Sequence, residues 1–250
     1  MTMPAEVRVI PLAGLPELEE GDDLAGLLAE ACVRAGGIED GDVIVVAQKA
    51  VSKVEGRIVR LADIDPSARA IELAGDEGDP RQAEVILRET IEVVRSRPPL
   101  VISQTSHGFV CASAGVDASN ANEPGTVILL PVDPDASAAA LRTRIGELTG
   151  IAPGVIVSDS FGRAWRQGTT DVALGVAGIV ALRDLRGTTD SRGYELRSTM
   201  IAVADEIAGA AELVMGKTND VPAAIVRGVN APGEGRGSDI VMPRERDLFR

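Results

Sequence analysis

Two aspartates stand where a folded chain could use them for chemistry. Asp117 and Asp159 each follow an apolar run that is typical of a buried strand, and Ser160 comes directly after the second of them. A carboxylate at the end of a buried strand needs a cation or hydrogen-bond donors. Carboxylate and hydroxyl oxygens are ligands that hard divalent cations prefer. The pattern is compatible with a divalent metal site and equally with aspartates that only cap turns.

Two arginines follow the second aspartate, and a tryptophan lies between them. Arg163 and Arg166 could neutralise a phosphate group, so the region suggests metal-assisted chemistry on a phosphorylated substrate. Trp165 is either a core anchor or a platform on which a ring could stack.

Composition limits the classes of partner. The 250-residue chain has a formal charge of −13, which repels nucleic acid and anionic membranes over most of its surface. Phosphate binding must therefore depend on local Lys or Arg side chains, backbone amides and metal ions. Two cysteines are too few for a disulfide framework or a zinc site. With no apolar run long enough to span a bilayer and no signal-peptide pattern, we expect a cytoplasmic protein without membrane or nucleic-acid partners.

The apolar patterns predict mixed helices and strands. Strands are expected at residues 7–12, 42–47, 100–102, 109–111, 127–130, 155–157 and 223–226. Helices are expected to begin near Asp22, Asp65, Asp79 and Asp133 and to cover residues 203–215, and the apolar face after Asp79 extends to Val94. Residues 172–182 are rich in Gly and Ala, which predicts close packing of backbones. Residues 183–194 are loop-like, and a surface tail is expected over residues 231–250.

One segment fits the loose phosphate-loop pattern, in which a glycine-rich turn and a lysine bind phosphates. It ends in Gly216, Lys217 and Thr218. A phosphate loop needs a strand before it and a helix after it, whereas here a helix precedes and a strand follows. We therefore interpret Gly216 as the end of a helix and Lys217 as a charge that faces the helix dipole.

Three further features have both a functional and an ordinary interpretation. Residues 48–53 follow a buried strand, so their lysines leave the sheet where ligands of α/β proteins bind, or they form a solvated turn. Residues 15–18 form a rigid turn whose backbone groups could contact a base. His107 is the only histidine, and a lone histidine on an apolar segment favours a structural role.

Several of these segments resemble the coenzyme F420-0:L-glutamate ligase family. The similarity runs from about residue 7 to residue 229, and the order and spacing of the matching segments agree with the family. They include residues 14–18, 21–24, 52–57, 112–120, 130–137, 158–166 and 204–208. The resemblance implies an α+β fold with a mixed sheet and two intertwined lobes, with no separate linker; an α/β fold is the alternative. It also implies a homodimer.

The resemblance implies a reaction and its co-substrates. Members of the family use GTP to join L-glutamate to the lactyl carboxylate of coenzyme F420-0, a deazaflavin, and then add a γ-linked glutamate. Phosphorylation of the carboxylate gives an acyl phosphate that an amine can attack. Mg²⁺ or Mn²⁺ offsets the charge on the phosphates, with up to two ions per subunit and K⁺ as a candidate monovalent ion.

The resemblance also assigns residues. Asp117 and Asp159 bind one divalent ion, Ser160 binds a second, and Arg163 and Arg166 are candidates for binding the acceptor or glutamate. The residues expected to line the GTP site are Leu15, Pro16, Glu17, Leu18, Gln48, Lys53 and Asn120.

Two departures from the family pattern affect these expectations. Lys217 stands near a place where some relatives carry an acid, which puts the second metal ion in doubt. Some relatives also continue into a flavin-binding reductase-like domain. We expect a ligase-like domain over residues 1–230 with no fused reductase domain. The alternatives are an amide ligase of the same chemistry acting on another carboxylate, and a metal-dependent phosphohydrolase or nucleotide-binding regulator.

Overall fold

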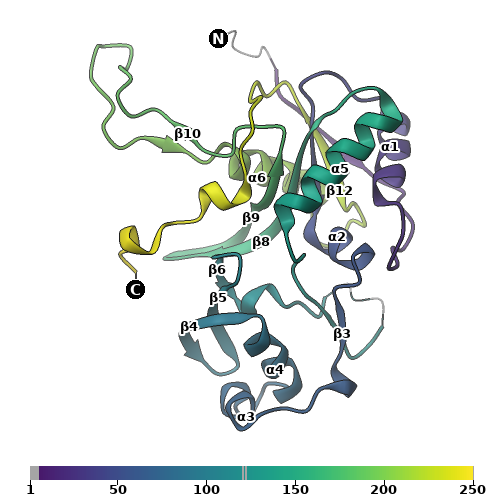
Figure 1. Cartoon of the computed structure of the whole chain (residues 1–250), viewed down its shortest axis with the longest axis vertical. Helices are drawn as coiled ribbons and strands as arrows, with labels where there is room; N and C mark the ends of the chain where they lie inside the picture. The colour runs from purple at the N-terminus through teal and green to yellow at the C-terminus, as the bar shows by residue number, and fades with distance from the viewer. Residues whose placement is uncertain (1–5, 120, 122, 250) are drawn as a thin grey trace.

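A computed structural model describes residues 6–119, 121 and 123–249 (Figure 1). Its centre is a five-stranded sheet in the order β1 (Arg8–Leu12), β12 (Ala223–Arg227), β2 (Val43–Ala47), β8 (Gly154–Arg163) and β9 (Arg166–Ala177). Strands β2 and β8 pair in parallel, and the other neighbours pair antiparallel. The mixed sheet confirms the predicted α+β class.

Both faces of this sheet are covered, which explains why its central strands are apolar throughout. On one face, α1 (Leu24–Arg34) and α5 (Pro134–Thr149) pack against Ile44, Val46, Val155 and Val157. On the other face, α6 (Val203–Met215) packs against Val43, Val45 and Ile156. Helix α6 coincides with the predicted helix over residues 203–215.

A second, smaller lobe is built from the middle of the chain and lies below the main sheet in Figure 1. Its own core joins Leu73, Val85, Val101 and Val127. Helix α2 (Gln48–Val54) leads into this lobe but packs in the core of the main sheet through Ala50 and Val51. The helices of the small lobe are α3 (Ala68–Ala74) and α4 (Pro80–Arg88). Its strands are β3 (Ile58–Arg60), β4 (Thr90–Arg97), β5 (Leu100–Thr105), β6 (Val110–Ala112) and β7 (Thr126–Ile128).

Short elements complete the described chain. Residues between β10 (Arg183–Asp184) and β11 (Met200–Ile201) form the long excursion at the upper left of Figure 1. Four 3₁₀ turns lie at Leu61–Asp63, Ser113–Gly115, Gly237–Ile240 and Arg244–Arg246. None of the helices in the described part of the chain has both the length and the apolar character needed to cross a bilayer.

Some local expectations were wrong. The helix after Asp79 ends at Arg88, and Thr90 begins strand β4. The spacing of Ile86, Thr90 and Val94 imitated a helix face, but β-branched residues after Glu89 favour a strand. The close packing of backbones predicted for the Gly- and Ala-rich segment is, in contrast, confirmed, because the Pro134 backbone lies so close to Gly175 in β9 that a Cβ would not fit there. In the expected surface tail, Ala231 and Gly237 are buried.

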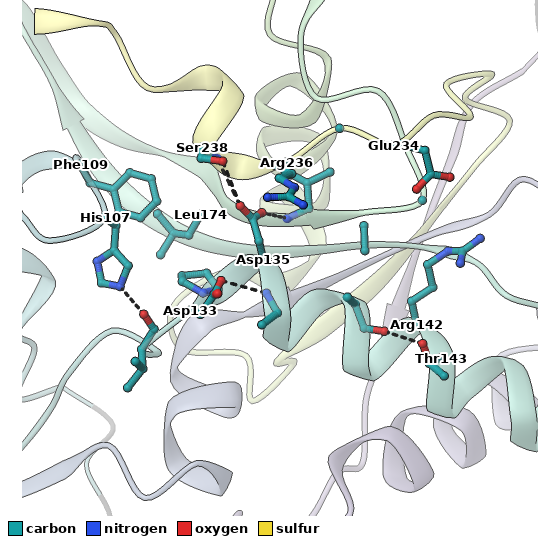
Figure 2. A pocket seen from close by; sticks show the side chains of 18 residues that line it. His107, Phe109, Asp133, Asp135, Arg142, Thr143, Leu174, Glu234, Arg236 and Ser238 are labelled. Atoms are coloured by element: carbon teal, nitrogen blue, oxygen red, sulfur yellow. Dashed lines mark hydrogen bonds between the residues drawn. The ribbon is translucent and has the colours of Figure 1, made fainter.

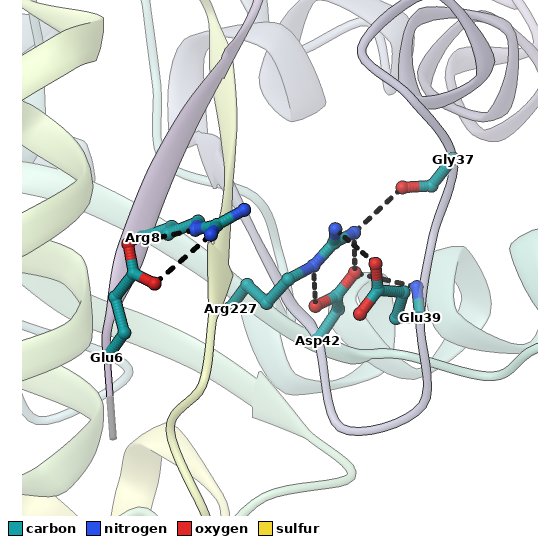
Figure 3. A network of polar contacts seen from close by, with 6 residues as sticks. All are labelled: Glu6, Arg8, Gly37, Glu39, Asp42 and Arg227. Carbon is teal, nitrogen blue, oxygen red and sulfur yellow. Dashed lines mark hydrogen bonds and ion pairs between the residues drawn. The ribbon is translucent and has the colours of Figure 1, made fainter. Parts of the chain in front are cut away.

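A charged network ties β12 to the turn before β2 (Figure 3). Arg227 donates to both carboxylate oxygens of Asp42, at 2.9 and 2.8 Å, to Glu39 at 2.6 Å and to the Gly37 carbonyl at 2.9 Å. The Asp42 side chain is 1% exposed. The Arg227 guanidinium donates to the Asp42 carboxylate in a bidentate geometry. These charged hydrogen bonds compensate the loss of water around that carboxylate.

We expect Arg227→Met to destabilise the protein by roughly 3 kcal/mol, because it leaves the buried Asp42 carboxylate without its cation. Urea unfolding of both proteins measures the difference. Arg8→Met, which removes an exposed partner of Glu6 on the adjacent strand, is the control and should change stability far less. Equal losses in the two variants would contradict the role assigned to Asp42.

Candidate functional site

The site begins where two parallel strands end side by side. Ala47 at the end of β2 is aligned with Ser158 in β8, so Asp159 lies next to the start of α2. The carboxyl ends of parallel strands are the usual position of ligand sites in sheets of this kind. Residues 48–53 form a helix and not a solvated turn, and Gln48, Ser52 and Lys53 are buried.

Lys49 contacts one of the two predicted metal ligands, Asp117. Its ammonium group contacts an Asp117 carboxylate oxygen at 2.7 Å and the Ser119 hydroxyl at 2.5 Å. The Asp117 carboxylate also accepts from the Ser119 amide at 2.7 Å. Burial alone would raise the pKa of Asp117, but the hydrogen bonds from Lys49 and Ser119 lower it overall. Asp117 is therefore held as a carboxylate.

Asp159 is in a different electrostatic environment. Burial raises the pKa of its carboxyl to about 7, and the charge of Asp171 acts in the same direction. A hydrogen bond from the Ser160 backbone and the charges of Lys49 and Lys217 oppose this rise. Lys49, which contacts Asp117, also acts through its charge on Asp159, so both predicted ligands are within the electrostatic range of one ammonium group. Below about pH 7, a further cation is therefore needed to keep the Asp159 side chain in its charged carboxylate form.

Ser160 lies on the opposite face of β8 from Asp159, because successive side chains of a strand alternate. Its hydroxyl donates to Asp171 at 2.7 Å, and the Ser158 hydroxyl donates to the other oxygen of Asp171 at 2.9 Å. Asp171 is 3% exposed, and sequence reasoning missed it. Its signal was an acid next to the apolar run of β9, but the partners that hold it come from β8.

The donor set suits a divalent ion that arrives with a nucleotide. Among the described residues, no group of three His, Cys, Asp or Glu side chains could hold a metal ion by itself. Asp117 and Asp159 nevertheless offer hard oxygen donors around one place. Mg²⁺ is commonly bound by one or two carboxylates, with phosphate and water oxygens completing its shell. The residues therefore fit such an ion, with Asp171 as the acid beside Ser160.

Two of the residues predicted for the nucleotide, Gln48 and Lys53, lie on α2. Lys53 contacts Glu17, another of the predicted residues, at 2.5 Å. Gln48 accepts from Ser52 at 2.8 Å through its carbonyl oxygen, whereas its buried amide nitrogen Nε2 has no hydrogen-bond partner among the described protein atoms. A buried donor without a partner is costly and is typical of a position that a ligand completes.

The other residues predicted to bind nucleotide or substrate differ in how exposed they are. Leu18 is buried and Leu15 packs against the same core, whereas Pro16 and Glu17 are exposed. Asn120 lies outside the described residues. The arginine candidates, at the far end of the β8–β9 hairpin, are both exposed.

All three lysines of the chain gather at this site. Lys49 and Lys53 share one face of α2, and the charge of Lys217 acts on Asp159 and Glu212. The other basic residues of the chain are arginines. In a protein with a formal charge of −13, this concentration of ammonium groups marks the place where a polyanion is best tolerated.

Gly216 and His107 have the structural roles that their sequence contexts favoured. Gly216 ends α6 with φ 59°, and the strand that follows is β12. No helix follows Lys217, so the segment lacks the context of a phosphate loop. His107 stacks on Phe109, and its Nε2 lies 2.9 Å from the Pro131 carbonyl, which gives it a structural role.

His107 borders a polar cavity of about 650 Å³ between α5 and residues 234–238 (Figure 2). Asp135, at the start of α5, is engaged by the amides of Val176 at 2.9 Å and Gly237 at 2.6 Å. Its carboxylate therefore attaches the C-terminal segment to the edge strand β9. We interpret this contact as structural.

Comparison with known proteins identifies the family of this chain. The model of the F420-0:gamma-glutamyl ligase family matches residues 14–228. The chain belongs to this family. A protein of Archaeoglobus fulgidus named coenzyme F420:L-glutamate ligase is 46% identical over 246 residues, which cover 98% of this chain and 96% of that protein.

Two further relatives carry the same name. The protein of Methanocaldococcus jannaschii is 47% identical over 85% of this chain and 86% of its own length. The protein of Methanopyrus kandleri is 44% identical over 98% of each chain. The similarity therefore covers both lobes and every described part of the site.

The pKa of Asp159 predicts a pH-dependent effect on stability. The ordinary value is 3.8 and the folded value is about 7, so between these values the folded protein retains a proton that the unfolded chain releases. Stability therefore falls as the pH rises through this window. The measurement is the melting temperature of metal-free Asp159→Asn minus that of the original protein. This difference should be larger, in favour of the variant, at about pH 8 than at about pH 5. The same difference at both values would contradict the assignment.

Proposed function

We propose that this protein uses GTP to join L-glutamate to coenzyme F420-0, through an acyl phosphate, in coenzyme F420 biosynthesis. The ligase activity on F420-0 rests on one observation above the others, the close similarity to coenzyme F420:L-glutamate ligases over nearly the full chain. The geometry of the site supports the finer parts of the proposal, which are the nucleotide, the metal and the residue roles.

The nucleotide is proposed to lie along α2. Lys53 exchanges its contact with Glu17 for a phosphate oxygen, because an ammonium group binds a phosphate more strongly than an exposed carboxylate in water. The unpartnered Gln48 amide donates to the same ligand. Leu15, Pro16 and Leu18 form the adjacent turn, with Asn120 as a further candidate. The lysine-rich edge offsets the charge that an acidic protein would otherwise present to GTP.

Asp117 and Asp159 are proposed to hold Mg²⁺ or Mn²⁺ between them and the phosphates. When bound, the ion offsets charge on the phosphates and helps to align donor and acceptor. Lys49, already paired with Asp117, keeps that carboxylate ionised and adds a second positive charge. Ser160 with Asp171 is the proposed place of a second ion, and K⁺ is a candidate monovalent ion.

The reaction follows from the chemistry of the acceptor. A lactyl carboxylate oxygen attacks the γ-phosphorus of GTP, the bond to the β-γ bridging oxygen breaks, and GDP leaves. The amine of glutamate, after loss of a proton, then attacks the acyl carbon, and inorganic phosphate leaves with the electron pair of the broken C–O bond. The positive charges of Lys49 and Lys53 stabilise the phosphoryl oxygens during the first step. A γ-linked glutamate can be added by the same sequence.

Two properties of the assembly belong to the same proposal. We place the enzyme in the cytoplasm, where GTP and glutamate are available, and we propose a homodimer. The apolar side chains of Trp165, Leu248 and Phe249 are exposed near one another at the hairpin tip and the C-terminal segment, which is a surface that a second copy could cover.

The proposal predicts a coupled reaction. Mass spectrometry of F420-0 incubated with protein, GTP, Mg²⁺ and glutamate should show products heavier by one and then two glutamyl residues. GTP should support the reaction better than ATP, and omission of the metal should abolish it. Phosphate release should require both F420-0 and glutamate. Equal phosphate release without glutamate would favour a phosphohydrolase, and product formation from a different carboxylate alone would favour another amide ligase.

Lys53 provides a test of the nucleotide site. Lys53→Met keeps the length of the buried stem and removes the charge, so we expect GTP affinity to fall about tenfold or more, in line with the loss of one charge-assisted hydrogen bond. Isothermal titration calorimetry measures the change. Arg192→Gln, an exposed basic residue in the excursion between β10 and β11, is the control. Unchanged affinity in Lys53→Met would remove Lys53 from the site.

A further inference from the structure

The polar cavity between α5 and residues 234–238 is not used by any role assigned above to the nucleotide, the metal or the acceptor (Figure 2). Its volume of about 650 Å³ is within the range of sites for small ligands. Three parts of the chain line it: α5, the second half of β9 and residues 234–238. The charged side chains on these walls decide which ligand the cavity suits.

Arg142 on α5 lines the cavity with an unsatisfied cation. Its guanidinium nitrogen Nε is buried and has no hydrogen-bond partner among the described protein atoms. No carboxylate of the described residues pairs with Arg142, whereas Arg144 on the same helix pairs with Asp23 and Glu147. A buried charged donor without a partner is costly. Only two other buried side-chain atoms in the described part of the chain lack a partner, and one of them belongs to Gln48 at the proposed nucleotide site.

The end of β9 makes room for this guanidinium. Gly178 directly follows β9 and has φ 76°, a conformation that favours glycine. A Cβ at this position would lie 2.2 Å from Nε of Arg142 and 2.9 Å from its Cδ. Any other residue at Gly178 would therefore displace the Arg142 side chain. A glycine, and not a carboxylate, thus determines where the guanidinium lies.

The opposite wall adds one cation and one anion. Arg236 and Glu234 both line the cavity, both are exposed, and neither forms an ion pair with another described side chain. In Figure 2 the Glu234 carboxylate lies on the same side of the view as the Arg142 guanidinium. The two groups form no ion pair with each other, so each is available to a ligand between them.

The other acids of the cavity are already engaged by the protein. Asp133 accepts the Ala136 amide at 3.0 Å as the N-cap of α5. Asp135 accepts the amides of Val176 and Gly237. The charged groups that remain without a partner in the described protein are therefore two guanidinium groups and one carboxylate.

We infer that this cavity binds a small amino dicarboxylate, such as L-glutamate, at a second site separate from the site of phosphoryl transfer. Such a ligand carries two carboxylates and one ammonium group, the reverse of the unpaired charges on the walls. Its carboxylates pair with Arg142 and Arg236, and its ammonium group pairs with Glu234. The ligand class follows from these charges and not from the proposed reaction.

The position of Arg142 separates this site from the reacting groups. Asp159 is aligned with Val172 of β9. Gly178, against which Arg142 lies, is six residues further along the chain, which corresponds to roughly 20 Å of strand. An amino group held near Arg142 is therefore too far from Asp159 to attack an acyl phosphate there.

A ligand in this cavity connects two parts of the chain. Arg142 belongs to α5, whereas Glu234 and Arg236 belong to the segment that continues to the C-terminus. The far end of that segment reaches the hairpin tip, where the Phe249 ring centroid is 4.7 Å from that of Trp165. A ligand that binds only when the segment is docked stabilises the docked state. The bound amino dicarboxylate thus holds the C-terminal segment against α5.

Calorimetric titration of the full-length protein with L-glutamate, without GTP and F420-0, tests the site. Arg142→Met and Arg236→Met should each weaken binding about tenfold or more, as expected for loss of one charged hydrogen bond. Gly178→Ala should weaken it as well, because it displaces the Arg142 guanidinium. Arg144→Met, the same substitution at an exposed and already paired position of α5, is the matched control and should leave the affinity within about twofold.

Two further probes test the ligand class. Glutarate, which lacks the ammonium group, should bind the wild type about tenfold more weakly than L-glutamate, and Glu234→Gln should remove most of that preference. If inorganic phosphate instead binds more tightly than L-glutamate and depends on Arg142, the cavity takes phosphate and the amino dicarboxylate is wrong. Hydrogen exchange of residues 234–249 should slow on addition of L-glutamate in the wild type but not in Arg142→Met.

Product formation distinguishes this site from the reacting one. At saturating L-glutamate, Arg142→Met should form glutamylated F420-0 at a rate within about twofold of the wild type. Loss of product in this variant, with its melting temperature unchanged, would mean that glutamate reacts from the cavity, and the separate site would be wrong. Unchanged L-glutamate affinity in both Arg142→Met and Gly178→Ala would overturn the site and leave the proposed function intact. Binding that depends on Arg142, with no product from the wild type, would overturn the proposed function alone.

Discussion

The parallel pairing of β2 with β8 is the constraint on which the site depends. Strands that run in parallel need a long crossover, and here the crossover contains the small lobe. Because Ala47 is aligned with Ser158, the helix that follows β2 begins next to Asp159. The same crossover carries Asp117 back to Lys49. A shift of one residue in this register would turn Asp159 to the opposite face of the sheet.

Charge imposes the second constraint. An acidic chain that binds anions must collect its positive charge locally, and the three lysines do so at one edge of the sheet. Arginines serve elsewhere, as Arg227 does around the buried Asp42. A lysine is a compact charge on a flexible stem, whereas an arginine holds a fixed bidentate geometry. That difference suits lysine to moving phosphates and arginine to a permanent structural pair.

The two faces of the β8–β9 hairpin have separate roles. One face carries Asp159 and Phe161, and the charge of Lys49 acts on Asp159. The other carries Ser160 and Asp171, joined by a hydrogen bond at 2.7 Å. Strand alternation thus divides a run of polar residues into two environments.

Much of this protein was determined by local sequence. The central strands, helix α6 and its glycine end were predictable because apolar periodicity and helix termination act over a few residues. The motifs that identify the family are equally local. Tertiary structure alone decided that Thr90 and Val94 belong to a strand and that Lys53 is buried. It also decided that Asp171 joins Ser160. These outcomes depend on pairing and packing between segments far apart in the chain, which no local pattern contains.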